Sequence, residues 1–145
     1  MGEDSNQKLG DFFTWRDALW LPRWKRLASI EELDPKIIRN LTEVFLKLNQ
    51  LRKFLNNPIV VVSAFRPPEY NKLIGGAVNS AHMEGKAVDF KVKFMRPDEV
   101  RQIILRYGML EVLNIRMEDL PGSSWIHIDT RDPGSCGKRF FLPKS

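Results

Sequence analysis

The feature that most constrains the fold of this chain is a one-sided helix that leads directly into an apolar strand. Asp34 and Pro35 form a helix start, because aspartate caps a first turn and proline is favoured at the first helical position. Apolar residues then recur at helical spacing and predict an amphipathic helix over residues 35–55. These residues are Ile37, Ile38, Leu41, Phe45, Leu48 and Leu55. Asn-Asn-Pro at 56–58 ends the helix, and the β-branched residues at 59–62 predict a buried strand.

Helical and extended patterns continue along the rest of the chain. We expect strands over 87–92, 110–116 and 125–130, a helix that begins at 97–99 and ends near Gly108, and an edge strand near 138–142. Residues 1–33 are rich in Trp and Phe without a clean period, which predicts an N-terminal wrap of short helix and loops. We therefore expect one domain over 1–145, with its core in 34–142.

Composition limits the class of protein. The 145 residues are 43% hydrophobic and 28% charged, which is typical of a globular domain. The net charge of +5 favours an anionic partner, but Lys and Arg are spread along the chain, so we expect no nucleic-acid binding. Cys136 is the single cysteine, which excludes an internal disulfide and a cysteine-based zinc cluster.

The N-terminal residues carry neither a basic segment nor an apolar segment of the kind found in a signal peptide. No stretch approaches the ~20 apolar residues that a membrane span needs. We expect a monomer that is made in the cytoplasm and acts at a cell wall only after release or export by another route.

The chain has two histidines, His82 and His127, and each lies in a segment suited to present it. His82 is near the end of a Pro-, Asn- and Gly-rich stretch at 66–86, which we expect to be a loop with about one helical turn; loops of such length are usually functional. In the strand at 125–130, alternation places Trp125, His127 and Asp129 on one face and leaves Ile126 and Ile128 for the core.

Two histidines and a carboxylate are a common ligand set for catalytic zinc, which keeps a further position open. His82, Asp89 and His127 supply this set, and a metal would compensate the charge of Asp89 in an otherwise apolar strand. Each residue alone has a simpler explanation: His82 as a solvated loop residue, His127 as a hydrogen-bonded strand residue and Asp89 as an ion-pair partner.

A long two-part motif joins these residues. The stretch SAFRPPEYNKLIGGAVNSAHMEGKAVDF, followed by WIHIDTR, resembles the zinc D-alanyl-D-alanine carboxypeptidases, peptidase family M15, and especially the small domains of bacterial and phage cell-wall enzymes. The resemblance covers about 70 residues, from Ser63 to Arg131. It implies one Zn²⁺ per chain, bound by His82, Asp89 and His127.

The resemblance also implies roles for other residues. Arg66 matches an arginine that lies by the active site and pairs with a substrate carboxylate, and Ser80 matches a serine near the substrate. Tyr70 and Trp125 are further candidates for substrate contact. Arg66 and Tyr70 have the alternative role of bracing the loop, and Trp125 that of shielding the metal.

The chain departs from the family pattern at one position. Several branches have a glutamate three residues before the second histidine as general base, and Ser124 stands there in this chain. Branches without that glutamate exist, so the change does not by itself indicate an inactive enzyme. Asp129 is the nearest candidate base by sequence, and Glu118 and Asp119 come next.

Together these patterns predict an α+β domain with a small, mostly antiparallel sheet, helices packed on one face and a single zinc site. The implied function is a zinc metallopeptidase that hydrolyses peptidoglycan stem peptides, as a D,D-carboxypeptidase or as an endopeptidase of the endolysin type. The alternative is a catalytically inactive, zinc-stabilised module of the same fold that binds cell wall or serves as a phage structural part.

Overall fold

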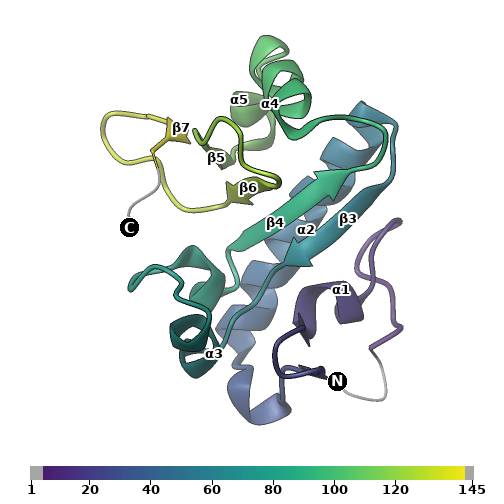
Figure 1. Ribbon diagram of the computed structural model, residues 1–145, viewed down its shortest axis with the longest axis vertical. Helices are drawn as coiled ribbons and strands as arrows, with labels where there is room; N and C mark the ends of the chain where they lie inside the picture. Colours follow the sequence, from purple (N-terminus) through teal and green to yellow (C-terminus); the bar gives the residue numbers. More distant parts are fainter. Residues whose placement is uncertain (1–4, 143–145) are drawn as a thin grey trace.

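The computed structural model describes residues 5–142 and confirms an α+β fold (Figure 1). The ends of the expected domain, residues 1–4 and 143–145, lie outside the described range. The helices are α1 (Trp15–Leu19), α2 (Pro35–Leu55), α3 (Pro68–Leu73), α4 (Pro97–Arg106) and α5 (Met109–Leu113), with 3-10 turns η1 (Ile30–Glu32) and η2 (Ala81–Glu84). The strands are β1 (Trp20–Leu21), β2 (Arg26–Leu27), β3 (Ile59–Ser63), β4 (Ala87–Val92), β5 (Arg116–Glu118), β6 (Ile126–Asp129) and β7 (Phe140–Phe141).

Helix α2 is the longest element and has the bounds that the sequence predicts. The Asp34 side chain accepts a hydrogen bond from the backbone N–H of Ile37 at 2.8 Å, which satisfies one of the free donors of the first turn. Asn56 ends the helix in the left-handed conformation, with a φ of 54°. Figure 1 shows α2 crossing behind β3 and β4, so its apolar face forms one side of the core.

The main sheet has five strands in the order β3-β4-β6-β5-β7. Its first three pairings are antiparallel, whereas β7 runs parallel to β5. The expectation of a mostly antiparallel sheet is therefore confirmed, although the sheet is mixed at its β7 edge. The expectation of helices on one face describes α2, while α4 and α5 lie together beyond the end of β4 (Figure 1).

The strand expected over 110–116 is wrong in its first part. Met109, Leu110 and Leu113 are buried on one side of α5, at helical rather than alternating spacing. Gly108 and Asn114 bracket this helix in left-handed conformations, and β5 starts only at Arg116. A short apolar run fits either structure, and burial against α2 and α4 decides it.

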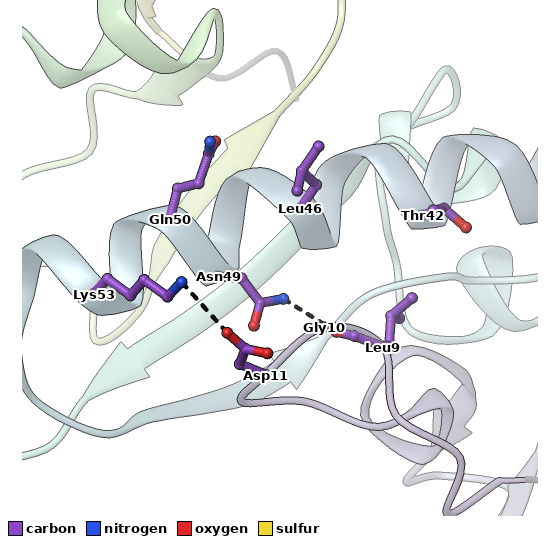
Figure 2. Close-up of a pocket in the computed structure, with 8 residues that line it drawn as sticks. All are labelled: Leu9, Gly10, Asp11, Thr42, Leu46, Asn49, Gln50 and Lys53. Atoms are coloured by element: carbon purple, nitrogen blue, oxygen red, sulfur yellow. Dashed lines mark hydrogen bonds and ion pairs between the residues drawn. The ribbon is translucent and has the colours of Figure 1, made fainter.

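The N-terminal segment wraps against α2 through one buried amide. Asn49 donates to the carbonyl of Leu9 at 3.0 Å and to that of Phe45 at 2.7 Å, and it accepts from the N–H of Phe12. Figure 2 shows Asn49 in a pocket of about 400 Å³ between this segment and the helix, beside an ion pair of Asp11 and Lys53. This pocket holds none of the candidate site residues.

The stretch at 66–86 contains more regular structure than the single turn expected. Helix α3 and the turn η2 both lie inside it, and Gly85 ends η2 with a φ of +72°. A Cβ atom on Gly85 would lie 2.9 Å from the carbonyl oxygen of Ile37, so α2 passes too close for a side chain there. Among residues 5–142, no helix is long and apolar enough to cross a bilayer.

Candidate active site

Strand register brings the candidate ligands together. Asp89 on β4 lies directly opposite His127 on β6, and Ser63 on β3 lies opposite Asp89 on its other side. Directly opposite residues share a face of the sheet, so these side chains project together. On the opposite face, Ile126 and Ile128 are fully buried in the core.

His82 reaches the same point from the turn η2. The Ser80 hydroxyl caps this turn by accepting from the His82 N–H at 3.1 Å, and the ring Nδ1 lies 2.7 Å from the carbonyl oxygen of Ala64. A carbonyl oxygen cannot donate, so Nδ1 carries the proton of this bond. Burial lowers the pKa of His82 despite the nearby Asp89, so the ring is neutral and its Nε2 has a free lone pair.

His127 is oriented by two carboxylates. Its Nδ1 lies 2.8 Å from Oδ1 of Asp89, and its Nε2 lies 3.0 Å from Oδ2 of Asp129. Burial alone would lower the pKa of His127, but the hydrogen bonds to Asp129 and Asp89 raise it to about 10. Without a metal the ring therefore carries a proton on each nitrogen.

The donor set fits a zinc ion. One ligand atom each from His82, Asp89 and His127 lie within 4.8 Å of one another. Tetrahedral zinc with bonds near 2.0 Å would hold such atoms about 3.3 Å apart, close to the 3.2 Å between His82 Nε2 and Asp89 Oδ1. The unprotonated Nε2 faces a carboxylate oxygen at this distance, and a cation bound between them would make that contact favourable.

Arg66 fixes the orientation of Asp89. Its Nη2 donates to Asp89 Oδ2 at 3.2 Å, its Nε to the Ser63 hydroxyl at 3.0 Å, and its Nη1 to the Asn71 side chain at 3.3 Å. Oδ1 of Asp89 is thereby left to face both histidines. Burial would raise the pKa of Asp89, but the two histidines hold it well below its ordinary value.

A cavity of about 760 Å³ opens over these residues. Its polar lining includes the three candidate ligands, three arginines and two further carboxylates. The charged residues besides the ligands are Arg66, Arg116, Arg131, Glu118 and Asp129. The apolar part of the lining includes Ile74, Val78, Trp125, Phe141 and Leu142. The arrangement can hold a metal at the three candidate ligands and a polar molecule beside it.

Not all expected substrate residues reach this cavity. Ser80 and Trp125 line it, and Trp125 is 40% exposed. Tyr70 does not line it: its ring packs edge-on against Trp24, and its hydroxyl accepts from the backbone N–H of Arg23 at 3.0 Å. Of the alternative bases, Glu118 lines the cavity and Asp119 does not.

Asp129 lies fully buried in a set of contacts that the sequence does not reveal. Arg116 on β5 lies directly opposite Asp129 in the sheet and donates two hydrogen bonds to its carboxylate, at 2.7 and 3.0 Å. Burial would raise the pKa of Asp129, but the bonds from His127 and Arg116 lower it, so the carboxylate is ionised. The pairing of Arg116 with Asp129 depends on strand register, and no sequence pattern near Arg116 predicts that register.

A second ion pair holds the cavity rim. Arg131 bonds to Glu84, just after the candidate ligand His82, and to the carbonyl oxygen of Asn79 at 3.0 Å. Asn40 of α2 donates to the carbonyl oxygen of Glu84 at 2.8 Å. The loop that carries His82 is thus tied both to the end of β6 and to the main helix.

Comparison with known proteins agrees with this site. A profile of the family described as peptidase M15 matches residues 26–129, which include all three candidate ligands. A curated relative, "Probable peptidoglycan L,D-endopeptidase MepK" of Haemophilus influenzae, is 28% identical over 116 residues. The match covers 77% of this chain and 58% of the relative, so the chain spans less than two thirds of the relative's length.

Among solved structures, the crystal structure of the L-Ala D-Glu endopeptidase ChiX of Serratia marcescens is similar at 17% identity, with a TM-score of 0.44. That alignment covers 72% of this chain and 94% of ChiX.

Proposed function

The chain belongs to the peptidase M15 family, and from this premise we propose that it is a zinc-dependent peptidase acting on the stem peptides of peptidoglycan. The observation that carries the proposal is the convergence of His82 Nε2 and His127 Nδ1 on Asp89 Oδ1, among residues that line one cavity. Zinc bound by these atoms supplies Lewis-acid chemistry, activating water and polarising a carbonyl group. The protein's own residues supply the rest.

Arg66 is suited to orient a substrate. A guanidinium has five N–H donors, and three of them bond to Ser63, Asn71 and Asp89 within the described structure. Two donors remain, and Arg66 lines the cavity, so it can grip a carboxylate or carbonyl oxygen of a peptide beside the metal. Its bond to Asp89 couples substrate position to ligand position.

Glu118 is the best-placed carboxylate to move a proton. It lines the cavity from β5, and no hydrogen bond to another residue of 5–142 occupies its side chain. Burial lowers the pKa of Arg66, and the nearby charge of Glu118 partly opposes that change. Asp129, by contrast, is engaged by Arg116 and His127. Glu118 can therefore accept a proton from water and pass it to the leaving amine.

The substrate class follows from charge and from the relative. The net charge of +5 favours approach to an anionic cell wall. The relative's name describes an L,D-endopeptidase of peptidoglycan, which favours endopeptidase over carboxypeptidase action for this chain as well.

Digestion of purified peptidoglycan tests the proposal. Zinc-loaded protein, metal-stripped protein and the isosteric variant Asp89→Asn are incubated with peptidoglycan, and soluble products are identified by mass spectrometry. We expect peptide fragments only from the zinc-loaded wild type. Fragments with new internal ends indicate an endopeptidase, and free D-alanine alone indicates a carboxypeptidase.

An inactive module gives a different result. If the wild type binds one zinc and sediments with peptidoglycan but releases nothing, the protein is a wall-binding module and the peptidase proposal fails. If it neither binds zinc nor releases fragments, the metal site itself is wrong.

A further inference from the structure

We propose that Arg116 and Asp129 act as a positioning pair that fixes His127 as a metal ligand through Nδ1, and that Asp129 is not the general base. The inference rests on the metal site of the proposed function and assigns roles to two residues beside it. It starts from the surroundings of Asp129, which is fully buried 3.0 Å from a candidate ligand.

The carboxylate of Asp129 has no free acceptor position. Arg116 Nε and the backbone N–H of Arg131 donate to Oδ1, at 2.7 and 3.2 Å. Arg116 Nη2 and His127 Nε2 lie 3.0 Å from Oδ2. A carboxylate has about four acceptor positions, so these contacts use all of them and leave none to take a proton from water.

Arg116 is itself held in place. Its strand β5 pairs with β6 so that Arg116 and Asp129 are directly opposite, and its guanidinium lies 4.1 Å from the ring centre of Phe141 on β7. A bidentate arginine paired with a carboxylate has a fixed geometry. Strands β5 and β7 thus hold Arg116 against Asp129, and Asp129 orients the histidine ring.

The consequence for His127 is a choice of nitrogen. Because Asp129 accepts from Nε2, a neutral His127 keeps its proton there and presents the lone pair of Nδ1 toward Asp89. His82 is set in the opposite way, with Nδ1 bonded to Ala64 and Nε2 facing Asp89. Each histidine therefore has a backbone or carboxylate partner that selects which nitrogen binds the metal.

Nitrogen NMR of the two imidazole rings tests the assignment directly. In zinc-loaded wild type we expect His127 to carry its proton on Nε2 and to bind through Nδ1, with the reverse for His82. A zinc-loaded His127 protonated on Nδ1 would overturn the inference, whatever the activity.

Variants then measure the contribution of the pair. We expect Asp129→Asn to weaken zinc affinity by about 10- to 100-fold and to alter the visible absorption of the cobalt-substituted protein. Arg116→Lys keeps the charge but loses the paired hydrogen bonds, so we expect a smaller loss and a spectrum closer to wild type. If Asp129→Asn does not fold, the zinc affinity and cobalt spectrum of Arg116→Lys still test the positioning role.

Glu32→Gln is the matched control, because it neutralises a carboxylate that also accepts two hydrogen bonds from an arginine, Arg26, and neither residue lines the cavity. We expect it to change zinc affinity less than about twofold. Equal losses in Glu32→Gln and Asp129→Asn, or no loss in Asp129→Asn, would refute the positioning role. Failure of the wild type to bind zinc would instead refute the proposed function.

Discussion

His127 and Asp89 face each other across the β4–β6 pairing, with the histidine Nδ1 2.8 Å from the carboxylate Oδ1. In the protein without metal, a proton on Nδ1 occupies the space between these atoms. If zinc were bound, His127 Nδ1 would be a ligand atom together with Asp89 Oδ1 and would have given up that proton, because a metal ligand must be deprotonated. The same pair of atoms would therefore be joined by a hydrogen bond in the metal-free protein and would both be ligand atoms in the metal-bound protein.

Asp89→Asn should abolish stoichiometric zinc binding. The substitution keeps the shape of the side chain but removes the negative charge that faces both histidines. Metal content after gel filtration should fall from about one zinc per chain to less than one tenth, measured by plasma mass spectrometry. Retention of one equivalent by the variant would exclude Asp89 as a ligand.

The stability of the metal-free protein should fall between pH 7 and pH 10. The pKa of His127 is raised to about 10 from its ordinary 6.5. The stabilisation of the folded state by protonated His127 is therefore complete below pH 6.5 and is lost as the pH rises through 10. The pKa of His82 is lowered, so this residue reduces the stability of the folded state only below pH 6.5. It does not affect the change in stability between pH 7 and pH 10.

Urea denaturation in the presence of a chelator measures this pH effect. We expect the free energy of unfolding to fall by a few kcal/mol over this range, on the order that such pKa shifts give. His127→Gln should be less stable at pH 7 but should show a much flatter profile. A wild-type profile as flat as that of the variant would contradict the two hydrogen bonds assigned to His127.

Glu118→Gln should lower kcat by about 10²- to 10⁴-fold while zinc affinity stays near that of wild type. Glutamine keeps the size of the side chain but cannot accept a proton. Asp119→Asn is the control, because the neighbouring Asp119 does not line the cavity. Steady-state kinetics on a synthetic stem peptide distinguishes the two, and a larger loss in Asp119→Asn would reverse the assignment.

Gly10→Ala should destabilise the protein more than Gly122→Ala. Both glycines have left-handed backbones, with φ of +88° and +82°, so each substitution incurs the ~1–2 kcal/mol strain of that conformation. A Cβ on Gly10 would also lie 2.2 Å from Nδ2 of Asn49, whereas nothing lies within 4 Å at Gly122.

Asn49 must move to admit the extra atom in Gly10→Ala, and its displacement breaks the buried hydrogen bonds that hold the N-terminal segment. We expect about 1–3 kcal/mol more destabilisation at Gly10 than at Gly122, measured by thermal denaturation. Equal losses would show that the N-terminal segment contributes little to stability.

Local signals predict the main helix and several strands of this fold. Asp34, Pro35 and the stop at 56–58 mark both ends of α2, because caps and breakers act within one turn. The run at 109–113 is mispredicted because its apolar residues are too few to define a period. Burial, which depends on the rest of the chain, makes it helical.

The site divides in the same way. The motif predicts a ligand set, and the structure brings His82, Asp89 and His127 together. The contacts of Asp129 with Arg116 and of Tyr70 with the N-terminal wrap depend on strand register and on packing between distant segments. No local pattern encodes such pairings, so the sequence alone leaves Asp129 a candidate base and Tyr70 a candidate for either substrate contact or bracing of the loop.

Strand β6 comes late in the chain but lies in the middle of the sheet, between β4 and β5. During synthesis, β4 leaves the ribosome with an unpaired edge, and Asp89 has no opposite residue until residues 126–129 follow. The candidate ligand set is consequently among the last parts of the fold to come together. A ribosome-bound fragment that ends before β6 would lack His127 and the strand that joins β4 to β5, so it would not contain the complete candidate ligand set.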